Sequence, residues 1–393
     1  MSRITTVMSR APRVLVAGVL TAGVLAGCGV GEKSSGSDDA ASDPAQLAHA
    51  KAEVEKYKAV PEFTLDAEPV DVAALKGKTI FNIPNNSQVP FNIAQDKAMK
   101  DVADRFGITF IQYENNGAAT EWSSGIAQAI SRKADLIMLG NGTDPRLVAP
   151  KLREAKDAGI PVISLHNYTD TQEVPKALDG LLAGFTRGPF ERGARLVADY
   201  IIAASEGKAN ILEIRSSDLS PDNPMTKAFN DEIKQYCPGC TTEHLDIPVT
   251  QWGQQITPQV QTALTANPKI DWIAPHYDFM GTLAATGVKQ AGAKDRVKMA
   301  SFNGNLAPLE MIQKKDVYVA DVGEDITWLS WAQMDLAFRI MAGQDPLPDN
   351  DPKTATRILD ESNIDEVGTP PAFGKGYGDA YVTGYEKLWG VTP

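Results

Sequence analysis

The segment that decides the fold is GKTIFNIPNNSQVPFNIAQDKAMKDVADRFGITFIQY, residues 77–113. Two short apolar runs, residues 79–83 and 108–113, flank a stretch at 91–106 whose apolar side chains recur at helical intervals. This order predicts a strand, an amphipathic helix and a second strand. Because a strand that returns through a helix enters the sheet parallel to the first, the segment indicates a right-handed βαβ unit.

The same alternation of short apolar runs and helical patterns continues as far as residue 341. Strict alternation of this kind is typical of parallel sheets with helices on both faces. The sequence therefore predicts an α/β fold with doubly wound parallel sheets. Strands are expected at residues 79–83, 108–113, 135–139, 161–165, 210–214, 243–246, 272–275, 298–302 and 317–322, and helices at 91–106, 122–132, 145–158, 190–205, 225–236, 253–266, 279–290 and 329–341.

Length and composition are those of a globular protein with room for two domains. The chain has 393 residues, of which 43% are hydrophobic and 22% charged, so it can bury more than one core. The formal net charge of −12 repels phosphate backbones. Nucleic acid is therefore not an expected partner.

Residues 1–27 have the features of a targeting signal. Arg3, Arg10 and Arg13 precede an uncharged apolar run at residues 14–25, which is shorter than the ~20 residues of a membrane-spanning helix. The run ends in LAGC at residues 25–28. This motif resembles a bacterial lipobox, which implies a cleaved lipoprotein signal peptide and lipidation of Cys28. The alternative is an uncleaved anchor with an incidental cysteine.

Two segments separate Cys28 from the first predicted strand. Residues 28–45 are mostly Gly, Ser, Asp and Ala without periodicity, a composition expected of a flexible tether. Residues 46–58 have apolar side chains at helical spacing. We therefore expect an N-terminal helix and extension over residues 46–75.

Cys237 and Cys240 form a CPGC motif at the end of a predicted helix. A redox-active pair would stand at the start of a helix, and zinc would need ligands beyond the nearby His244. An exported chain favours oxidised cysteines, so a structural disulfide is expected.

The sequence offers no motif for catalysis or for a cofactor. It contains no G-x-S-x-G, H-E-x-x-H or G-x-x-x-x-G-K-[ST], and His49, His166, His244 and His276 are not spaced as metal ligands. We expect no enzyme activity, no cofactor and no metal site.

Polar residues follow most of the predicted strands, where ligands of α/β sheets bind. They occur at residues 85–92, 141–144, 166–167, 277–278, 303–305 and 324–325. Over roughly residues 76–392 the chain resembles the type I periplasmic solute-binding proteins, in particular the ribose-binding-like sugar receptors of ABC importers. The motifs that carry the resemblance are GKTI (77–80), VPF (89–91), IAQAI (126–130), AGIPV (158–162), YDFM (277–280) and SFNG (301–304).

The resemblance implies two lobes joined by a hinge of three crossings, with the ligand between them. The first lobe would comprise residues 76–184 and about 325–346, and the second residues 186–324 and about 347–393. A ligand that touches both lobes stabilises their closed arrangement. An ABC permease would then receive the ligand.

The resemblance also implies which residues bind the ligand. Phe91 and Trp252 match two aromatics that stack on it from opposite lobes. Relatives have Arg at positions occupied here by Asn167 and Met225, so no guanidinium clamps a sugar oxygen. The full set of expected ligand contacts is Phe91, Asn92, His166, Asn167, Trp252, Tyr277, Asp278, Asn303 and Glu324.

Each contact has a structural alternative. Phe91 and His166 could be core residues, Asp278 could cap the next helix, and Glu324 could belong to a hinge network. The function expected is a lipid-anchored, extracytoplasmic receptor that delivers a monosaccharide or polyol to an ABC importer. The alternative is a sensor for a nucleoside or another small polar or cationic molecule, presented to a membrane signalling protein.

Overall fold

The structure is a computed structural model that describes residues 43–391. The described residues 43–391 belong to one compact unit. The predicted signal peptide, Cys28 and most of the predicted tether lie outside the described residues. None of the helices between residues 43 and 391 has the length and apolar character needed to cross a membrane.

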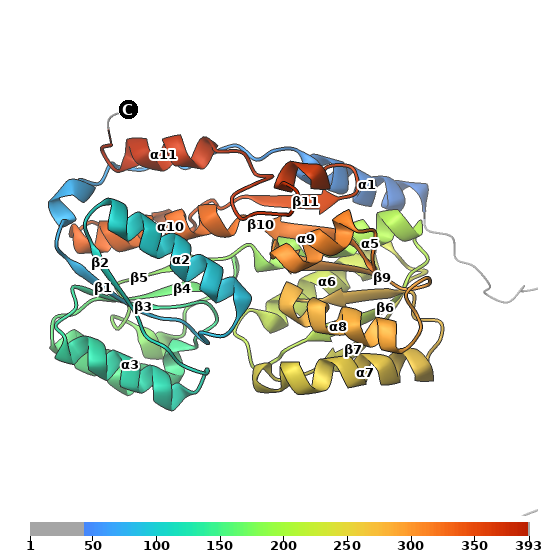
Figure 1. Ribbon diagram of the computed structural model, residues 1–393, viewed down its shortest axis with the longest axis horizontal. Coiled ribbons are helices and arrows are strands. Elements are labelled where there is room, and N and C mark those ends of the chain that lie inside the picture. Colours follow the sequence, from blue (N-terminus) through green and yellow to red (C-terminus); the bar gives the residue numbers. More distant parts are fainter. Residues whose placement is uncertain (1–42, 392–393) are drawn as a thin grey trace, which may run out of the picture. The chain divides into compact units, whose positions relative to one another are not determined.

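The first lobe is built on a parallel sheet with strand order β2-β1-β3-β4-β5 (Figure 1). Helices cover both faces, so its central strands are largely buried; β3 is Leu-Ile-Met-Leu and wholly buried. Its strands are β1 (Thr79–Ile83), β2 (Thr109–Gln112), β3 (Leu136–Leu139), β4 (Val162–Tyr168) and β5 (Gly184–Arg187), and its helices α2 (Pro90–Arg105), α3 (Ala119–Ser131), α4 (Ala149–Asp157) and α10 (Ile326–Met341).

The second lobe has the strand order β11-β10-β9-β8-β6-β7, in which β11 alone runs antiparallel. Its strands are β6 (Asn210–Arg215), β7 (Thr241–Asp246), β8 (Trp272–Pro275), β9 (Lys298–Asn303), β10 (Tyr318–Glu324) and β11 (Thr356–Asp360), and its helices α5 (Phe190–Ser205), α6 (Asp222–Tyr236), α7 (Trp252–Ala266), α8 (Asp278–Gln290) and α9 (Leu306–Gln313). The predicted α/β fold with two parallel-sheet lobes is thus confirmed.

Short 3-10 turns complete the regular structure. They are η1 (Val72–Leu75), η2 (Pro145–Val148), η3 (Lys176–Leu178), η4 (Val249–Gln251), η5 (Pro348–Asn350) and η6 (Ile364–Val367). Sequence patterns did not identify β5 or β11, because both are short strands that contain charged or polar residues, GFTR and TRILD.

The chain passes between the lobes where β5 leads into α5, where β10 leads into α10, and between α10 and β11. These are the three expected crossings. Two more are present in the described residues, one at residues 59–71 and one at 361–379. They arise because α1 (Pro44–Lys58) packs on α5 and β11 of the second lobe, whereas α11 (Ala380–Leu388) packs on α10 of the first (Figure 1).

The position of α11 differs from the expected assignment of residues 347–393 to the second lobe. Tyr381 stacks on Trp328 at a centroid distance of 5.1 Å, and Trp389 stacks on Trp331 at 5.0 Å. These rings belong to the apolar core of the first lobe. Burial of large aromatic surfaces therefore keeps the C-terminal helix there, although β11 joins the second sheet.

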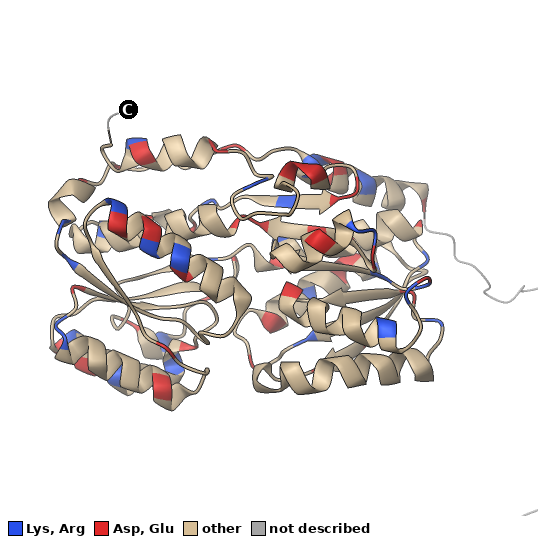
Figure 2. Cartoon of the chain, viewed as in Figure 1, with Lys and Arg blue, Asp and Glu red and all other residues tan. Residues whose placement is uncertain are grey.

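The two faces of helix α2 differ in charge and in burial. Its solvent face carries alternating Lys and Asp (Figure 2), paired as Lys97–Asp101 at 2.6 Å and Lys100–Asp104 at 2.5 Å. Spacing of four residues places each pair on one face. The opposite face is buried and carries Phe91 and Asn92 at its first turn.

Cys237 and Cys240 are joined by a disulfide, with their Cα atoms 5.3 Å apart. The bond connects the end of α6 to the start of β7. The backbone N–H of Ala209 also donates to Cys240 Sγ at 3.4 Å, so the pair borders the sheet of the second lobe.

Candidate functional site

In each sheet the strand order reverses at one point, and the edge formed by the carboxyl ends of the strands faces the other lobe. In the first sheet the order reverses between β1 and β3, and in the second between β6 and β8. Loops diverge at such points and leave a crevice at the carboxyl ends of the strands. Asn85 and Asn141 follow β1 and β3, while Leu219 and Tyr277 follow β6 and β8.

These loops line one cavity between the lobes, with an empty volume of about 620 Å³ that includes open solvent. From the first lobe come Asn85, Val89, Phe91, Asn92, Asn141, Gly142 and His166, the first-lobe wall. From the second come Phe190, Leu219, Pro221, Val249, Trp252, Tyr277, Phe279, Asn303 and Asn305, the second-lobe wall. None of these lining residues is Asp, Glu, Lys or Arg.

Aromatic rings dominate the second-lobe wall. Trp252 opens α7 and stacks beside Tyr277, with centroids 6.1 Å apart, while Phe279 lies 6.2 Å away. The indole N–H of Trp252 donates to Ser216 Oγ at 3.1 Å and to the Ile247 carbonyl at 3.0 Å. These hydrogen bonds fix the ring, leaving its face for a ligand.

A buried ion network lies behind these rings. His276 Nε2 is 2.7 Å from Glu213 Oε1, and its Nδ1 is 2.9 Å from Asp222 Oδ1. Burial alone would lower the pKa of His276, but hydrogen bonds to Asp222 and Glu213 outweigh it and raise the pKa to about 9. Asp222 also accepts from the backbone N–H of Ser216 at 2.7 Å, which connects the network to the residue that holds Trp252.

Carboxamides dominate the first-lobe wall. Asn92 donates to Asn85 Oδ1 and, at 2.8 Å, to the Asn86 carbonyl. Asn141 donates to Asn92 Oδ1 at 3.0 Å and to Gln95 Oε1. Each amide offers both donors and acceptors, so this wall can satisfy hydroxyl groups of either orientation.

His166 occupies the hinge side of the cavity. Its ring stacks beside Phe91 at 5.9 Å and lies 4.4 Å from Phe190. Its Nε2 is 2.8 Å from Glu324 Oε2, and the other oxygen of Glu324 accepts from Thr354 Oγ1 at 3.0 Å. Glu324 is therefore engaged in a network that joins the two lobes at their crossings.

Asp278 is fully buried at the start of α8. Its carboxylate accepts from Ser301 Oγ at 2.6 Å and from the backbone N–H of Asn305 at 2.6 Å. Burial raises the pKa of Asp278, while these hydrogen bonds act in the opposite direction. The side chain thus holds the loop that carries Asn303 and Asn305 to the cavity.

The structure brings six of the nine expected contacts together along the cavity: Phe91, Asn92, His166, Trp252, Tyr277 and Asn303. Asn167, Asp278 and Glu324 are buried beside it and do not line it. Sequence reasoning omitted Asn85, Asn141, Asn305, Phe190 and Phe279 from the site, all of which line the cavity. The three asparagines could have been found from the sequence, because they follow predicted strands. The two phenylalanines could not, because their sequence pattern is that of core residues.

A family model described as "Periplasmic binding protein domain" matches residues 80–345. The chain belongs to this periplasmic binding protein family. The resemblance recognised in the sequence is therefore confirmed for family and fold. Members are substrate-binding proteins of transporters and not enzymes.

Two curated relatives of this binding protein are sugar receptors. The D-apiose import binding protein of Actinobacillus succinogenes is 26% identical over 220 residues, 55% of this chain and 66% of that protein, just under two thirds of its length. The D-ribose/D-allose-binding protein of Pseudomonas aeruginosa is 22% identical over 267 residues, 66% of this chain and 79% of that protein.

Solved structures share the fold of this binding protein. An ABC transporter solute-binding protein from Agrobacterium vitis, bound with α-D-tagatopyranose, superposes with a TM-score of 0.66 at 20% identity. The match covers 76% of this chain and 100% of the other. The two lobes are thus those of a type I periplasmic binding protein.

Proposed function

We propose that this protein captures a neutral monosaccharide or polyol between its lobes. The observation that carries the proposal is the composition of the cavity: rings dominate the second-lobe wall, carboxamides dominate the first-lobe wall, and no Asp, Glu, Lys or Arg is among the lining residues. Rings stack on the C–H faces of sugars, and amides bond to their hydroxyl groups. The relatives' names specify apiose, ribose, allose and tagatopyranose, all of which are neutral.

In this proposal the ligand touches Phe91, Asn92, His166, Trp252, Tyr277 and Asn303. Asp278 and Glu324 position those contacts through the hydrogen bonds described above, in place of the direct contacts expected from the sequence. Asn167 follows His166 at the end of β4 and is buried beside the cavity. No Arg or Lys lines the cavity, so an anionic ligand would find no countercharge.

A thermal-shift screen with calorimetry tests the proposal, because a ligand of the native state raises the unfolding temperature. Neutral pentoses, hexoses and polyols form one arm of the panel. Sugar phosphates, sugar acids, nucleosides and amines form the others. We expect the tightest ligand in the first arm. A ligand from any other arm that binds more tightly would contradict the proposal.

We further propose that the loaded protein delivers its ligand to an ABC permease. Uptake of the labelled ligand by cells should fall when this chain is deleted, and return when it is restored. Undiminished uptake after deletion, with the ligand still bound by the purified protein, would assign the chain to signalling instead.

We also propose that Cys28 carries a lipid that anchors the protein outside the cytoplasm. The basis is the run of Arg-rich leader, short apolar core and LAGC motif at residues 25–28. Cys28→Ser should release the protein from the membrane fraction and abolish incorporation of labelled fatty acid. A Cys28→Ser protein that stays membrane-bound would contradict the lipid anchor.

A further inference from the structure

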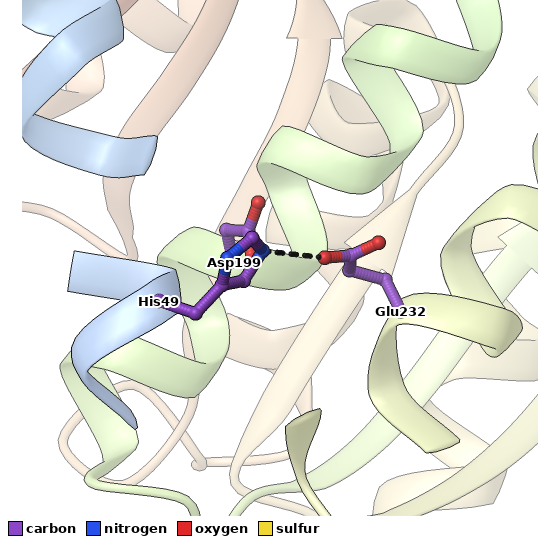
Figure 3. A group of neighbouring side chains, drawn as sticks. All are labelled: His49, Asp199 and Glu232. Atoms are coloured by element: carbon purple, nitrogen blue, oxygen red, sulfur yellow. Dashed lines mark hydrogen bonds and ion pairs between the residues drawn. The ribbon is translucent and has the colours of Figure 1, made fainter. Parts of the chain in front are cut away.

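Helix α1 meets the second lobe at three side chains that come from different helices. His49 lies on α1, Asp199 on α5 and Glu232 on α6 (Figure 3). One ligand atom of each lies within 4.8 Å of the other two. Imidazole nitrogen and carboxylate oxygens are ligands of zinc and of neighbouring divalent transition metals.

The geometry of this cluster is close to that of a coordinated ion. Ligand atoms of a tetrahedral zinc site lie ~2.0–2.2 Å from the metal and so ~3.4 Å from one another. His49 Nε2 is already 3.2 Å from Glu232 Oε1. All ligand atoms of the cluster lie within 4.8 Å of one another, so an ion has to draw Asp199 closer to the other two.

Burial and packing hold the three side chains in place. Asp199 is 2% exposed, and its Oδ1 has no hydrogen-bond partner among the described residues. The ring of His49 stacks on Tyr236 at 3.9 Å with an interplanar angle of 14°. The side chain of His49 is 36% exposed, so an ion can enter from solvent and keep a water as its fourth ligand.

Acidic side chains gather at the cluster. The carboxyl groups of Asp199 and Glu232 face each other, with Glu53 of α1 nearby and Arg195 as the neighbouring cation. A divalent cation can supply countercharge to two facing carboxylates.

We propose that His49, Asp199 and Glu232 bind a divalent transition-metal cation and that the bound ion joins helix α1 to the second lobe. Zn²⁺ is the probe for this site. The ion would hold α1 against α5 and α6. The sequence alone predicted no metal site, because these three ligands lie in separate parts of the chain and become neighbours only in the fold.

Calorimetric titration of Zn²⁺ into the untagged, metal-stripped protein tests the site. We expect one equivalent to bind and the unfolding temperature to rise. His49→Ala, at a partly exposed position, should weaken binding at least ~10-fold, the lower end of losses seen for groups that support metal sites. Co²⁺ should give the visible spectrum of a site with one His ligand, and that spectrum should disappear in the same variant.

His244→Ala is the matched control, since His244 is also a partly exposed histidine, 2.8 Å from the buried carboxylate of Glu213. It should bind Zn²⁺ as the wild type does. Asp199→Asn, if it folds, should behave as His49→Ala. Equal stoichiometry and affinity in wild type and His49→Ala would overturn the proposal. So would the absence of binding to wild type at a large excess of Zn²⁺.

Discussion

On the first-lobe wall of the cavity the polar groups are carboxamides that bond to one another, as Asn141 does to Asn92. On the second-lobe wall aromatic rings predominate beside Asn303 and Asn305, and the ion network of His276, Glu213 and Asp222 stands behind the rings. The first-lobe wall thus presents mainly hydrogen-bonding amides to the cavity, whereas the second-lobe wall presents mainly ring faces held from behind.

The difference assigns the two walls separate tasks in ligand capture. Neutral amides can exchange their mutual hydrogen bonds for bonds to a hydroxyl at little electrostatic cost. Buried ion pairs cannot reorganise in this way, since separating them leaves an uncompensated charge. We therefore expect the second-lobe wall to supply a rigid stacking surface and the larger share of the contact energy, and the first-lobe wall to discriminate among stereoisomers.

The largest effect is expected from the ion network behind the second wall. His276→Gln removes the cation between Glu213 and Asp222 and should destabilise the protein by ~3–5 kcal/mol, as for other broken buried ion pairs. Denaturant unfolding measures the change. His244→Gln is the control: it contacts the same Glu213 at 2.8 Å from a partly exposed position, and should cost less than ~1 kcal/mol.

The pH dependence distinguishes lost charge from lost packing in this variant. Hydrogen bonds to Asp222 and Glu213 outweigh burial and raise the pKa of His276 in the folded protein to about 9, above the ordinary histidine value of about 6.5. The contribution of its charge to stability is therefore complete below about pH 6.5 and disappears as the pH rises through 9. The difference in unfolding free energy between wild type and His276→Gln should thus shrink by ~3 kcal/mol over that interval. A difference that is independent of pH would assign the effect to packing.

The next effect concerns the ring surface itself. Trp252→Leu keeps an apolar side chain but removes the stacking face, and should weaken ligand binding by ~30–150-fold, or ~2–3 kcal/mol. Calorimetry with the ligand found in the screen measures the loss. Trp252→Phe retains a ring and should lose much less. Equal losses of affinity in both variants would show that the indole N–H of Trp252, and not its ring face, contributes to ligand binding.

The second lobe also carries the disulfide, whereas the first has no cysteine at all. Closing so short a loop should stabilise the second lobe by ~2 kcal/mol. Reductant should therefore increase hydrogen exchange in α6 and β7 and leave the first sheet unchanged, and the double variant Cys237→Ala, Cys240→Ala should not respond. Free thiols in the mass spectrum of the purified protein would contradict the bond.

Much of the fold could be predicted because strand and helix patterns are local. The nine strands expected before residue 323 all occur, since most are short apolar runs bounded by turns; β7, at the sheet edge, is the polar exception. The position of α11 could not be predicted, because it depends on contacts of Tyr381 and Trp389 with rings some fifty residues earlier. The association of α1 with α5 is equally non-local.

The site was predicted in part for a similar reason. Residues that follow strands could be located, so Asn92, Tyr277 and Asn303 were placed near the cavity. What a buried polar group bonds to cannot be read from its neighbours in sequence. Asp278 and Glu324 were therefore expected at the ligand, and the structure has them bonded to protein groups.

The smallest effect is expected on the first-lobe wall. Asn141→Ala removes the amide that donates to Asn92 Oδ1 at 3.0 Å and should weaken binding by ~10-fold, the value of one hydrogen bond. Because we expect the first-lobe wall to discriminate among stereoisomers, the loss of affinity in Asn141→Ala should differ between epimers of the ligand. Trp252→Leu should weaken the binding of all epimers equally. Asn86→Ala is the control, since its amide donates to the Asn116 carbonyl at 3.0 Å outside the cavity. An Asn141→Ala protein that binds every epimer as the wild type does would leave the first wall with a structural role alone.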